Sequence, residues 1–138
     1  MTRIVLDTSV LVSFLLTRGH TISRIMEQWE SGDIKVIVSP GILGELKRVA
    51  SDERIAKRLK SGALADLCRT LQKDAFVVAG ELELPGVTPD PEDDMVVACA
   101  VEGGADCIVT RDRHLLDLEE YVRMPILSPE EFVFPQGT

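Results

Sequence analysis

The acidic residues of this chain are informative because of where they stand along the sequence. Asp7 directly follows the aliphatic run 4–6, and Asp112 comes two residues after the apolar run 107–110. Both runs are typical of buried strands. Because parallel strands end at the same edge of a sheet, we expect these two carboxylates at the edge where open α/β folds place their sites.

Two predicted helices bring further acids to this edge. Glu45 lies in the second turn of the helix that starts at Pro40, beside its apolar face. A group of acids also surrounds the start of an apolar helix, namely Asp90, Asp93 and Asp94. Clustered carboxylates repel one another and raise each other's pKa unless a cation lies among them. Oxygen ligands alone favour Mg²⁺ or Mn²⁺, which can activate water for attack on a phosphodiester.

Each acid also has a purely structural interpretation. Asp7 could cap a helix or form a turn, and Glu45 alone could be a solvated helix residue. Asp90 and Asp93 fit an N-cap and its capping-box partner, while Asp112 could cap the short helix that follows it. Four separate elements would then direct acids to one sheet edge by accident, so the sequence favours a metal site.

Composition limits the class of protein. A chain of 138 residues with 45% hydrophobic and 28% charged residues predicts one folded domain, residues 1–138, with no membrane-spanning segment. The absence of a secretory pattern predicts a cytoplasmic location. Three cysteines without a C-x-x-C pair argue against a disulfide scaffold or a thiolate zinc site. The net charge of −8 opposes a protein that coats duplex DNA, but it does not exclude a metal-dependent phosphodiesterase, because bound cations present positive charge to phosphate.

Strand and helix patterns alternate along the chain. Apolar runs predict strands at 4–6, 34–38, 75–79, 107–110 and 125–127. Helices are predicted at 10–16, capped by Thr8 or Ser9, and at 21–31, 40–50, 52–72 with a break at Ser61-Gly62, 95–101, near 113 and from 129; residues 80–91 are predicted to form a loop. This alternation predicts an α/β fold with a mostly parallel central sheet of about five strands, covered by helices on both faces.

The order of these motifs resembles PIN-domain proteins, in particular the short prokaryotic toxin components of toxin–antitoxin pairs, the VapC-like ribonucleases. The similar segments are residues 4–10, residues 39–49, and residues 90–116, which read DPEDDMVVACAVEGGADCIVTRDRHLL. The resemblance runs over essentially the whole chain. It implies a three-layer α/β/α sandwich and a Mg²⁺- or Mn²⁺-dependent endoribonuclease that acts on RNA. It also implies an antitoxin protein as partner and a homodimer.

The resemblance assigns roles to individual residues. The metal-binding and catalytic acids it implies are Asp7, Glu45, Asp93 and Asp112. Ser9 and Thr110 match the supporting hydroxyl residues of the family motifs. Asp93 is preferred to Asp94 as the third acid because it lies seven residues before Ala100, and Asp94 is the alternative.

Two positions depart from the family pattern. Arg111 stands where glycine is usual, and His114 stands where a further aspartate is common. An imidazole is a poor ligand for a hard cation, so one metal ion is expected rather than two, although a protonated His114 could contact phosphate. Arg111 and Arg113 are further candidates for a phosphate contact.

Two other functions are compatible with the sequence. One is a binding module on the same scaffold that has no catalytic activity. The other is a haloacid-dehalogenase-like phosphatase, which also begins with a strand and an aspartate but needs a second aspartate where this chain has Ser9. Metal-dependent cleavage of RNA would separate the nuclease from the binding module, and activity on phosphomonoesters alone would favour the phosphatase.

Overall fold

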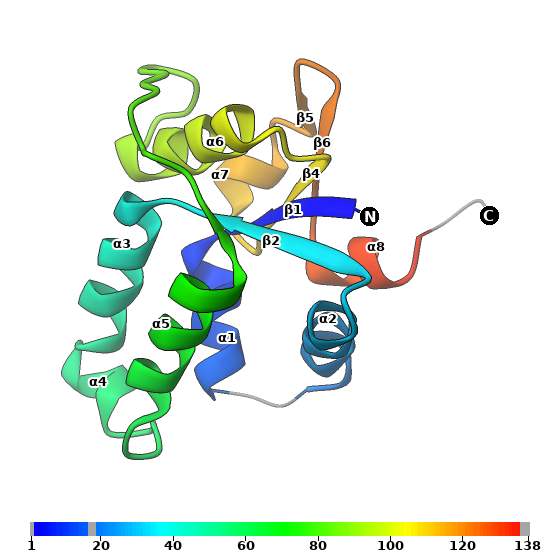
Figure 1. Cartoon of the computed structure of the whole chain (residues 1–138). Helices are drawn as coiled ribbons and strands as arrows, with labels where there is room; N and C mark the ends of the chain where they lie inside the picture. The colour runs from blue at the N-terminus through cyan, green and yellow to red at the C-terminus, as the bar shows by residue number, and fades with distance from the viewer. Residues whose placement is uncertain (1, 17–18, 136–138) are drawn as a thin grey trace.

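The computed structural model describes residues 2–16 and 19–135, and its centre is a sheet of mostly parallel strands (Figure 1). The strands are β1 (Thr2–Leu6), β2 (Ile34–Val38), β3 (Phe76–Val77), β4 (Cys107–Val109), β5 (Glu120–Tyr121) and β6 (Met124–Leu127). They lie in the order β3-β2-β1-β4-β6-β5. Every neighbouring pair is parallel except β5 and β6, which form an antiparallel hairpin. The predicted α/β class is confirmed.

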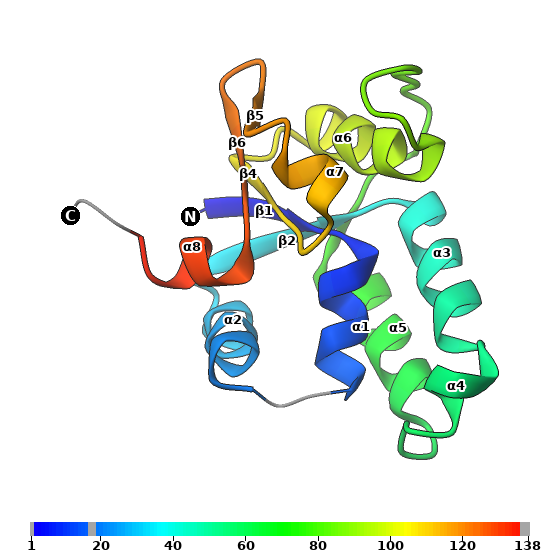
Figure 2. The same cartoon turned by 180° about the vertical axis from the view of Figure 1, so that it is seen from behind.

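Helices cover both faces of the sheet (Figures 1 and 2). On one face lie α6 (Pro91–Gly103) and α7 (Arg113–Leu116). On the other face lie α1 (Thr8–Leu16), α2 (His20–Ser31) and α5 (Ala63–Asp74). The remaining helices are α3 (Pro40–Ala50), which packs against α1, α5 and α6, and the short helices α4 (Glu53–Ala56) and α8 (Pro129–Val133). This arrangement is the three-layer α/β/α sandwich that the resemblance implied. Among the described residues, no helix is long and apolar enough to cross a membrane.

The central position of β1 decides where the acids lie. Ile4, Val5 and Leu6 are fully buried, because β1 has β2 and β4 as neighbours and helices above and below. A strand covered on both faces reads as a continuous aliphatic run, which is why the sequence identified it. Asp7 therefore leaves the sheet at the middle of its carboxyl edge. Asp112 lies at the same edge, two residues after Thr110, which directly follows the neighbouring strand β4.

The loop between β3 and α6 is held by carboxylates of α6. Glu102 accepts hydrogen bonds from the backbone N–H groups of Gly80, Glu81 and Leu82, at 3.2 to 3.4 Å. The predicted loop at 80–91 is confirmed up to residue 90, where α6 begins. Because its first residues are bonded to the C-terminal end of α6, the loop runs back along this helix to reach the start of it.

The structure corrects the sequence prediction at several boundaries. The strand predicted at 75–79 is shorter, Phe76–Val77, and one further backbone bond joins the N–H of Val78 to the carbonyl of Val38 at 2.9 Å. The strand β5 was not predicted, since its two residues form no apolar run. The helix predicted from residue 10 begins at Thr8. The break predicted at Ser61-Gly62 is confirmed, because α5 begins directly after Gly62, where φ is +83°, but α4 already ends at Ala56.

Gly103, at the end of α6, allows this helix to pack closely against β2. A methyl group added at Gly103 would lie 2.5 Å from Cγ2 of Ile37 on β2. We expect Gly103→Ala to lower the free energy of unfolding by about 1–3 kcal/mol, the usual cost of overpacking a core. Urea denaturation of both proteins measures the change.

Gly44→Ala is the matched control for this substitution. Gly44 lies inside α3, and no heavy atom is within 4 Å of the added methyl group. Replacing a helical glycine at an open position should raise the free energy of unfolding by roughly 0.5–1 kcal/mol. If both variants gained stability, the approach of α6 to β2 would be looser than described here.

Candidate metal centre

A cavity of about 290 Å³ opens at the carboxyl edge of the sheet. Acids from four separate elements line it: Asp7 after β1, Glu45 on α3, Asp90, Glu92 and Asp93 at the start of α6, and Asp112 after β4. The structure thus brings together the four acids that the family motifs indicated. Ser9 also lines this cavity.

Asp7 is buried and fully hydrogen-bonded. Its Oδ1 accepts from both the backbone N–H and the hydroxyl of Ser9, each at 2.5 Å, and its Oδ2 accepts from the hydroxyl of Thr110. Burial raises the pKa of Asp7, although the hydrogen bonds from Ser9 and Thr110 oppose this effect. The backbone carbonyl of Asp7 accepts from Val10 and Leu11, so Asp7 caps α1 in place of the predicted Thr8 or Ser9. Asp7 therefore caps a helix and lines the cavity at once.

Ser9 and Thr110 connect Asp7 to the loop after β4. The hydroxyl oxygen of Thr110 accepts a hydrogen bond from the backbone N–H of Asp112 at 2.9 Å. The hydroxyl oxygen of Ser9 accepts from the backbone N–H of Arg111 at 3.1 Å. These contacts fix the loop that carries Asp112 relative to Asp7, which is the supporting role expected of the two hydroxyl residues.

Asp94 is held by the loop before α6. Its side chain accepts hydrogen bonds from the backbone N–H of Thr88 at 2.6 Å and of Gly86 at 3.0 Å. Burial alone would raise the pKa of Asp94, but the hydrogen bonds from Thr88 and Gly86 hold it below its usual range. Asp94 does not line the cavity, so the structure places this alternative third acid in a purely structural position.

Asp93 has the opposite surroundings, although it is as buried as Asp94 at 7% exposure. Its Oδ2 is the one buried side-chain oxygen or nitrogen without a hydrogen-bond partner in residues 2–16 and 19–135. Burial, followed by the charges of Asp112, Asp90 and Asp7, raises the pKa of Asp93 to about 6. An uncompensated buried carboxylate is costly, so this oxygen indicates a missing positive ligand.

The capping prediction for α6 was correct for only one of its two residues. Asp90 is the N-cap, and its side chain accepts from the backbone N–H of Glu92 at 2.9 Å. Asp93 makes no reciprocal capping-box bond to Asp90, because the N–H of Asp90 donates to the hydroxyl of Thr88 instead. The side chain of Asp93 therefore makes no helix-capping hydrogen bond.

Glu45 reaches the cavity but is also paired with a cation. Its side chain is only 13% exposed, so the interpretation of Glu45 as a solvated helix residue was wrong. Nη2 of Arg48 lies 2.7 Å from both carboxylate oxygens of Glu45 and 2.8 Å from Oε1 of Glu92. Arg48 and Glu92 were not predicted from the sequence; the signal for Arg48 was its spacing of three residues from Glu45 on one helix.

His114 borders the acids. Its Nδ1 lies 3.8 Å from Oδ1 of Asp112 and 3.9 Å from Oδ2 of Asp93. These three residues each offer a ligand atom within 4.8 Å of the others. Asp112 also caps α7 by accepting from the backbone N–H of His114 at 2.7 Å. The imidazole is 58% exposed and lies on the solvent side of the cluster.

The two candidate arginines lie outside the cavity. Nη1 of Arg111 is 3.6 Å from Oε1 of Glu130 at the start of α8, so this side chain is directed towards α8. Arg113 is exposed at the start of α7 and forms no ion pair within the part of the chain that the structure describes. Of these two arginines, only Arg113 has a guanidinium without an ion-pair partner among the described residues.

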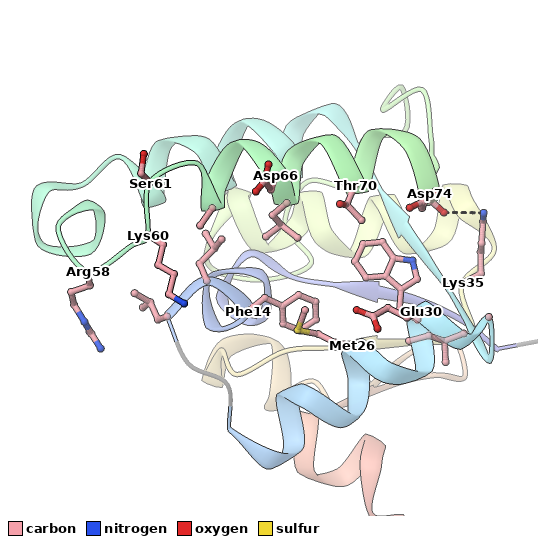
Figure 3. Close-up of a pocket in the computed structure, with 17 residues that line it drawn as sticks. Phe14, Met26, Glu30, Lys35, Arg58, Lys60, Ser61, Asp66, Thr70 and Asp74 are labelled. Atoms are coloured by element: carbon pink, nitrogen blue, oxygen red, sulfur yellow. Dashed lines mark hydrogen bonds between the residues drawn. The ribbon is translucent and has the colours of Figure 1, made fainter.

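A larger cavity of about 860 Å³ lies between α1, α2 and α5 (Figure 3). Its apolar side chains include Phe14, Met26 and Trp29. Nζ of Lys35 at one end donates to the backbone carbonyl of Asp74 at 3.2 Å. This groove contains none of the clustered acids, so its size does not make it the metal site.

The donor set of the smaller cavity fits a hard divalent cation. Carboxylate oxygens converge on it, and one of them is buried without a partner. Mg²⁺ and Mn²⁺ prefer such oxygen ligands. The three cysteines, Cys68, Cys99 and Cys107, are buried and free, and none lines this cavity.

Comparison with known proteins gives one family and two similar structures. The family model for the PIN domain matches residues 3–114. No curated protein sequence matches the chain. The crystal structure of VapBC2 from Rickettsia felis bound to a promoter DNA fragment is similar with a TM-score of 0.61 and 14% identity, covering 91% of this chain and 97% of that chain. The structure of FitAcB from Neisseria gonorrhoeae has a TM-score of 0.53 and 15% identity, with the same coverage of 91% and 97%. At these identities the likeness shows the fold.

The raised pKa of Asp93 predicts a pH-dependent stability of the metal-free protein. Between the unfolded pKa of about 4 and the folded pKa of about 6, the folded state binds more protons at Asp93, so stability falls as pH rises. Asp93→Asn should therefore raise the free energy of unfolding at pH 7 to 8 by roughly 1–3 kcal/mol. This gain should disappear below about pH 4, where Asp93 is protonated in both states. Urea denaturation in EDTA at both pH values measures it.

Asp94→Asn is the control on the neighbouring position. It weakens the bonds from Thr88 and Gly86, so it should lower the free energy of unfolding at pH 7 by about 1–3 kcal/mol. Changes of opposite sign in the free energy of unfolding of the two variants would support the different surroundings of the two carboxylates. A loss of stability in both at pH 7 would mean that Asp93 also has a partner.

Proposed function

Since this chain belongs to the PIN domain family, as its sequence motifs indicated, we propose that it is a metal-dependent endoribonuclease. The observation that carries the proposal is the unpaired buried oxygen of Asp93 among carboxylates of three other elements. The proposed ligands of one Mg²⁺ or Mn²⁺, direct or through water, are Asp7, Glu45, Asp93 and Asp112. Such an ion polarises a phosphoryl oxygen and activates water when bound.

The chain's own residues have distinct parts in this proposal. Ser9 and Thr110 hold the Asp7 carboxylate in one orientation before any ligand arrives, so little reorganisation is needed. A carboxylate of the cluster that is not a direct ligand accepts the proton of the attacking water. His114 in its protonated form and the uncommitted Arg113 stand on the solvent side, where they would contact phosphates of an RNA strand. Contact of Arg111 with a phosphate is less favoured, because its side chain faces Glu130.

We also propose an antitoxin protein as the natural partner. Both similar structures bear the names of two-component assemblies, VapBC2 and FitAcB, and the similarity covers nearly the full length of each matched chain. A small DNA-binding protein encoded in the adjacent reading frame would support this proposal. A second copy of the chain is the other partner that the family resemblance implies.

Mn²⁺ should stabilise the folded protein through Asp7. Wild type should show a rising Tm as Mn²⁺ exceeds its Kd, because the ion binds the folded state only. In Asp7→Asn this rise should shrink sharply, and cleavage of single-stranded RNA should fall at least about 100-fold, the usual scale for loss of a charged catalytic group. Asparagine caps a helix well, so the metal-free variant should stay as stable as wild type or gain stability.

Asp66→Asn is the control for this experiment. Asp66 is exposed on α5, where it pairs with Arg69, so its substitution should change neither the Mn²⁺ response nor cleavage. The proposal fails if wild type shows no Mn²⁺-dependent shift, or if Asp7→Asn cleaves RNA at the wild-type rate. Mn²⁺ binding without RNA cleavage would instead support the non-catalytic binding module.

His114→Asp should tighten Mn²⁺ binding. The imidazole Nδ1 is 3.8 to 3.9 Å from two acids of the cluster, so an aspartate there would add a hard oxygen ligand beside them. We expect a Kd about 3- to 30-fold lower in calorimetric titration, since one added negative charge near the ion contributes on this scale. His114→Asn removes the imidazole without adding charge and should show no such gain. An equal or weaker affinity of His114→Asp would mean that this position does not reach the ion.

A further inference from the structure

Arg48 places a positive charge at the mouth of the acidic cavity. It stands on α3 three residues after Glu45, and its guanidinium joins two acids of the cavity wall, Glu45 and Glu92. Both oxygens of Glu45 accept from the same nitrogen, Nη2. Glu45, an acid of the cavity wall, is thus already paired with a cation of the chain itself.

The arrangement costs little to undo. The Arg48 side chain is 63% exposed, and ion pairs of exposed side chains add little to folding stability because water screens them. Within residues 2–16 and 19–135, Nε and Nη1 of Arg48 have no hydrogen-bond partner, so most of its donors face solvent. Arg48 can therefore leave Glu45 without disturbing the core.

Glu45 cannot serve two cations equally well. A divalent ion that approaches both oxygens of Glu45 competes with Nη2, which is bonded to both of them, and the guanidinium charge opposes the approach of a second cation. Once released from Glu45, Arg48 stands beside the cavity with Nη2 still bonded to Glu92 and with Nε and Nη1 available to a ligand. A guanidinium in that position matches a phosphate group, which accepts two parallel hydrogen bonds from it.

We propose that Arg48 is the counter-ion of the metal-free site and a phosphate-binding residue of the metal-loaded site. It holds Glu45 and Glu92 in the absence of metal, releases Glu45 to the divalent cation, and then binds a phosphate of the RNA strand. This inference rests on the proposed function and adds a residue to which the resemblance assigned no role.

The first test measures Mn²⁺ affinity. Arg48→Gln should lower the Kd for Mn²⁺ about three- to tenfold in calorimetric titration of the metal-free protein at low salt, since it removes one nearby positive charge. The difference should narrow as ionic strength rises, because exposed charges are screened. The Tm of the metal-free variant should stay within about 2 °C of wild type, as expected for an exposed pair.

Lys47→Gln is the matched control for charge and helix position. Lys47 is the preceding residue of α3, exposed and in the same last turn, and it forms no ion pair with any described residue. It should leave the Mn²⁺ Kd within about twofold of wild type, because its charge lies outside the cavity. Equal effects of the two variants, or weaker binding by Arg48→Gln, would overturn the competition between Arg48 and the metal ion.

The second test measures the phosphate contact. Binding of a fluorescent single-stranded RNA is followed by anisotropy at several salt concentrations, with Ca²⁺ in place of Mn²⁺ and the RNA checked for integrity. Loss of one phosphate contact should reduce the slope of log K against log salt by about 0.7 in Arg48→Gln but not in Lys47→Gln. An unchanged slope in Arg48→Gln would overturn the phosphate-binding role.

The two proposals fail in different ways. If wild type binds no Mn²⁺ at all, the proposed function fails. If wild type binds Mn²⁺ but Arg48→Gln binds it with the same Kd, only the role of Arg48 fails.

Discussion

Repulsion between carboxylates at the carboxyl edge of the sheet is the interaction on which the rest of this structure depends. Three helices begin at the cavity, and each begins with an acid: Asp7 caps α1, Asp90 caps α6, and Asp112 caps α7. The N-terminus of a helix carries a partial positive charge from its unpaired N–H groups, which favours a nearby anion. These helix starts offset part of the repulsion. The carboxylate they do not offset is Asp93, whose side chain lies in the first turn of α6 but receives none of its N–H groups.

The sequence allowed the sheet and most of the acidic cluster to be predicted, for a physical reason. The strands β1 and β4 are buried on both faces, so their aliphatic runs are unmistakable, and the acid that follows each run must lie at the sheet edge. The roles of Asp93 and Asp94 could not be separated by burial, since both are 7% exposed. They differ because backbone groups of the loop at 86–88 reach one carboxylate and not the other, and the path of a loop has no periodic signal.

Structural and chemical interpretations of an acid proved compatible in this chain. Asp7 is a helix cap and a cavity wall, and Asp112 caps α7 while it faces His114 and Asp93. A cap needs only one oxygen lone pair, so a carboxylate retains others for a ligand. One aspartate of this chain can therefore be a helix cap and a candidate metal ligand together. Glu45 and Arg48 form an ordinary ion pair along one helix, at a spacing of three residues. This pair also places a positive charge beside the acidic cavity.

The bond between Asp7 and Thr110 joins residues 103 positions apart, and this separation has a consequence for synthesis of the protein. A ribosome adds Thr110 103 residues after Asp7, so β4 and the loop with Asp112 emerge long after the first acid of the cluster. Until then β1 lacks one of its two neighbours, and Asp7 lacks the hydroxyl that orients it. Domains generally fold as units during translation. A nascent chain can therefore expose the first acid of the cluster without possessing the cluster, and the site can assemble only after β4 and Asp112 have been synthesised.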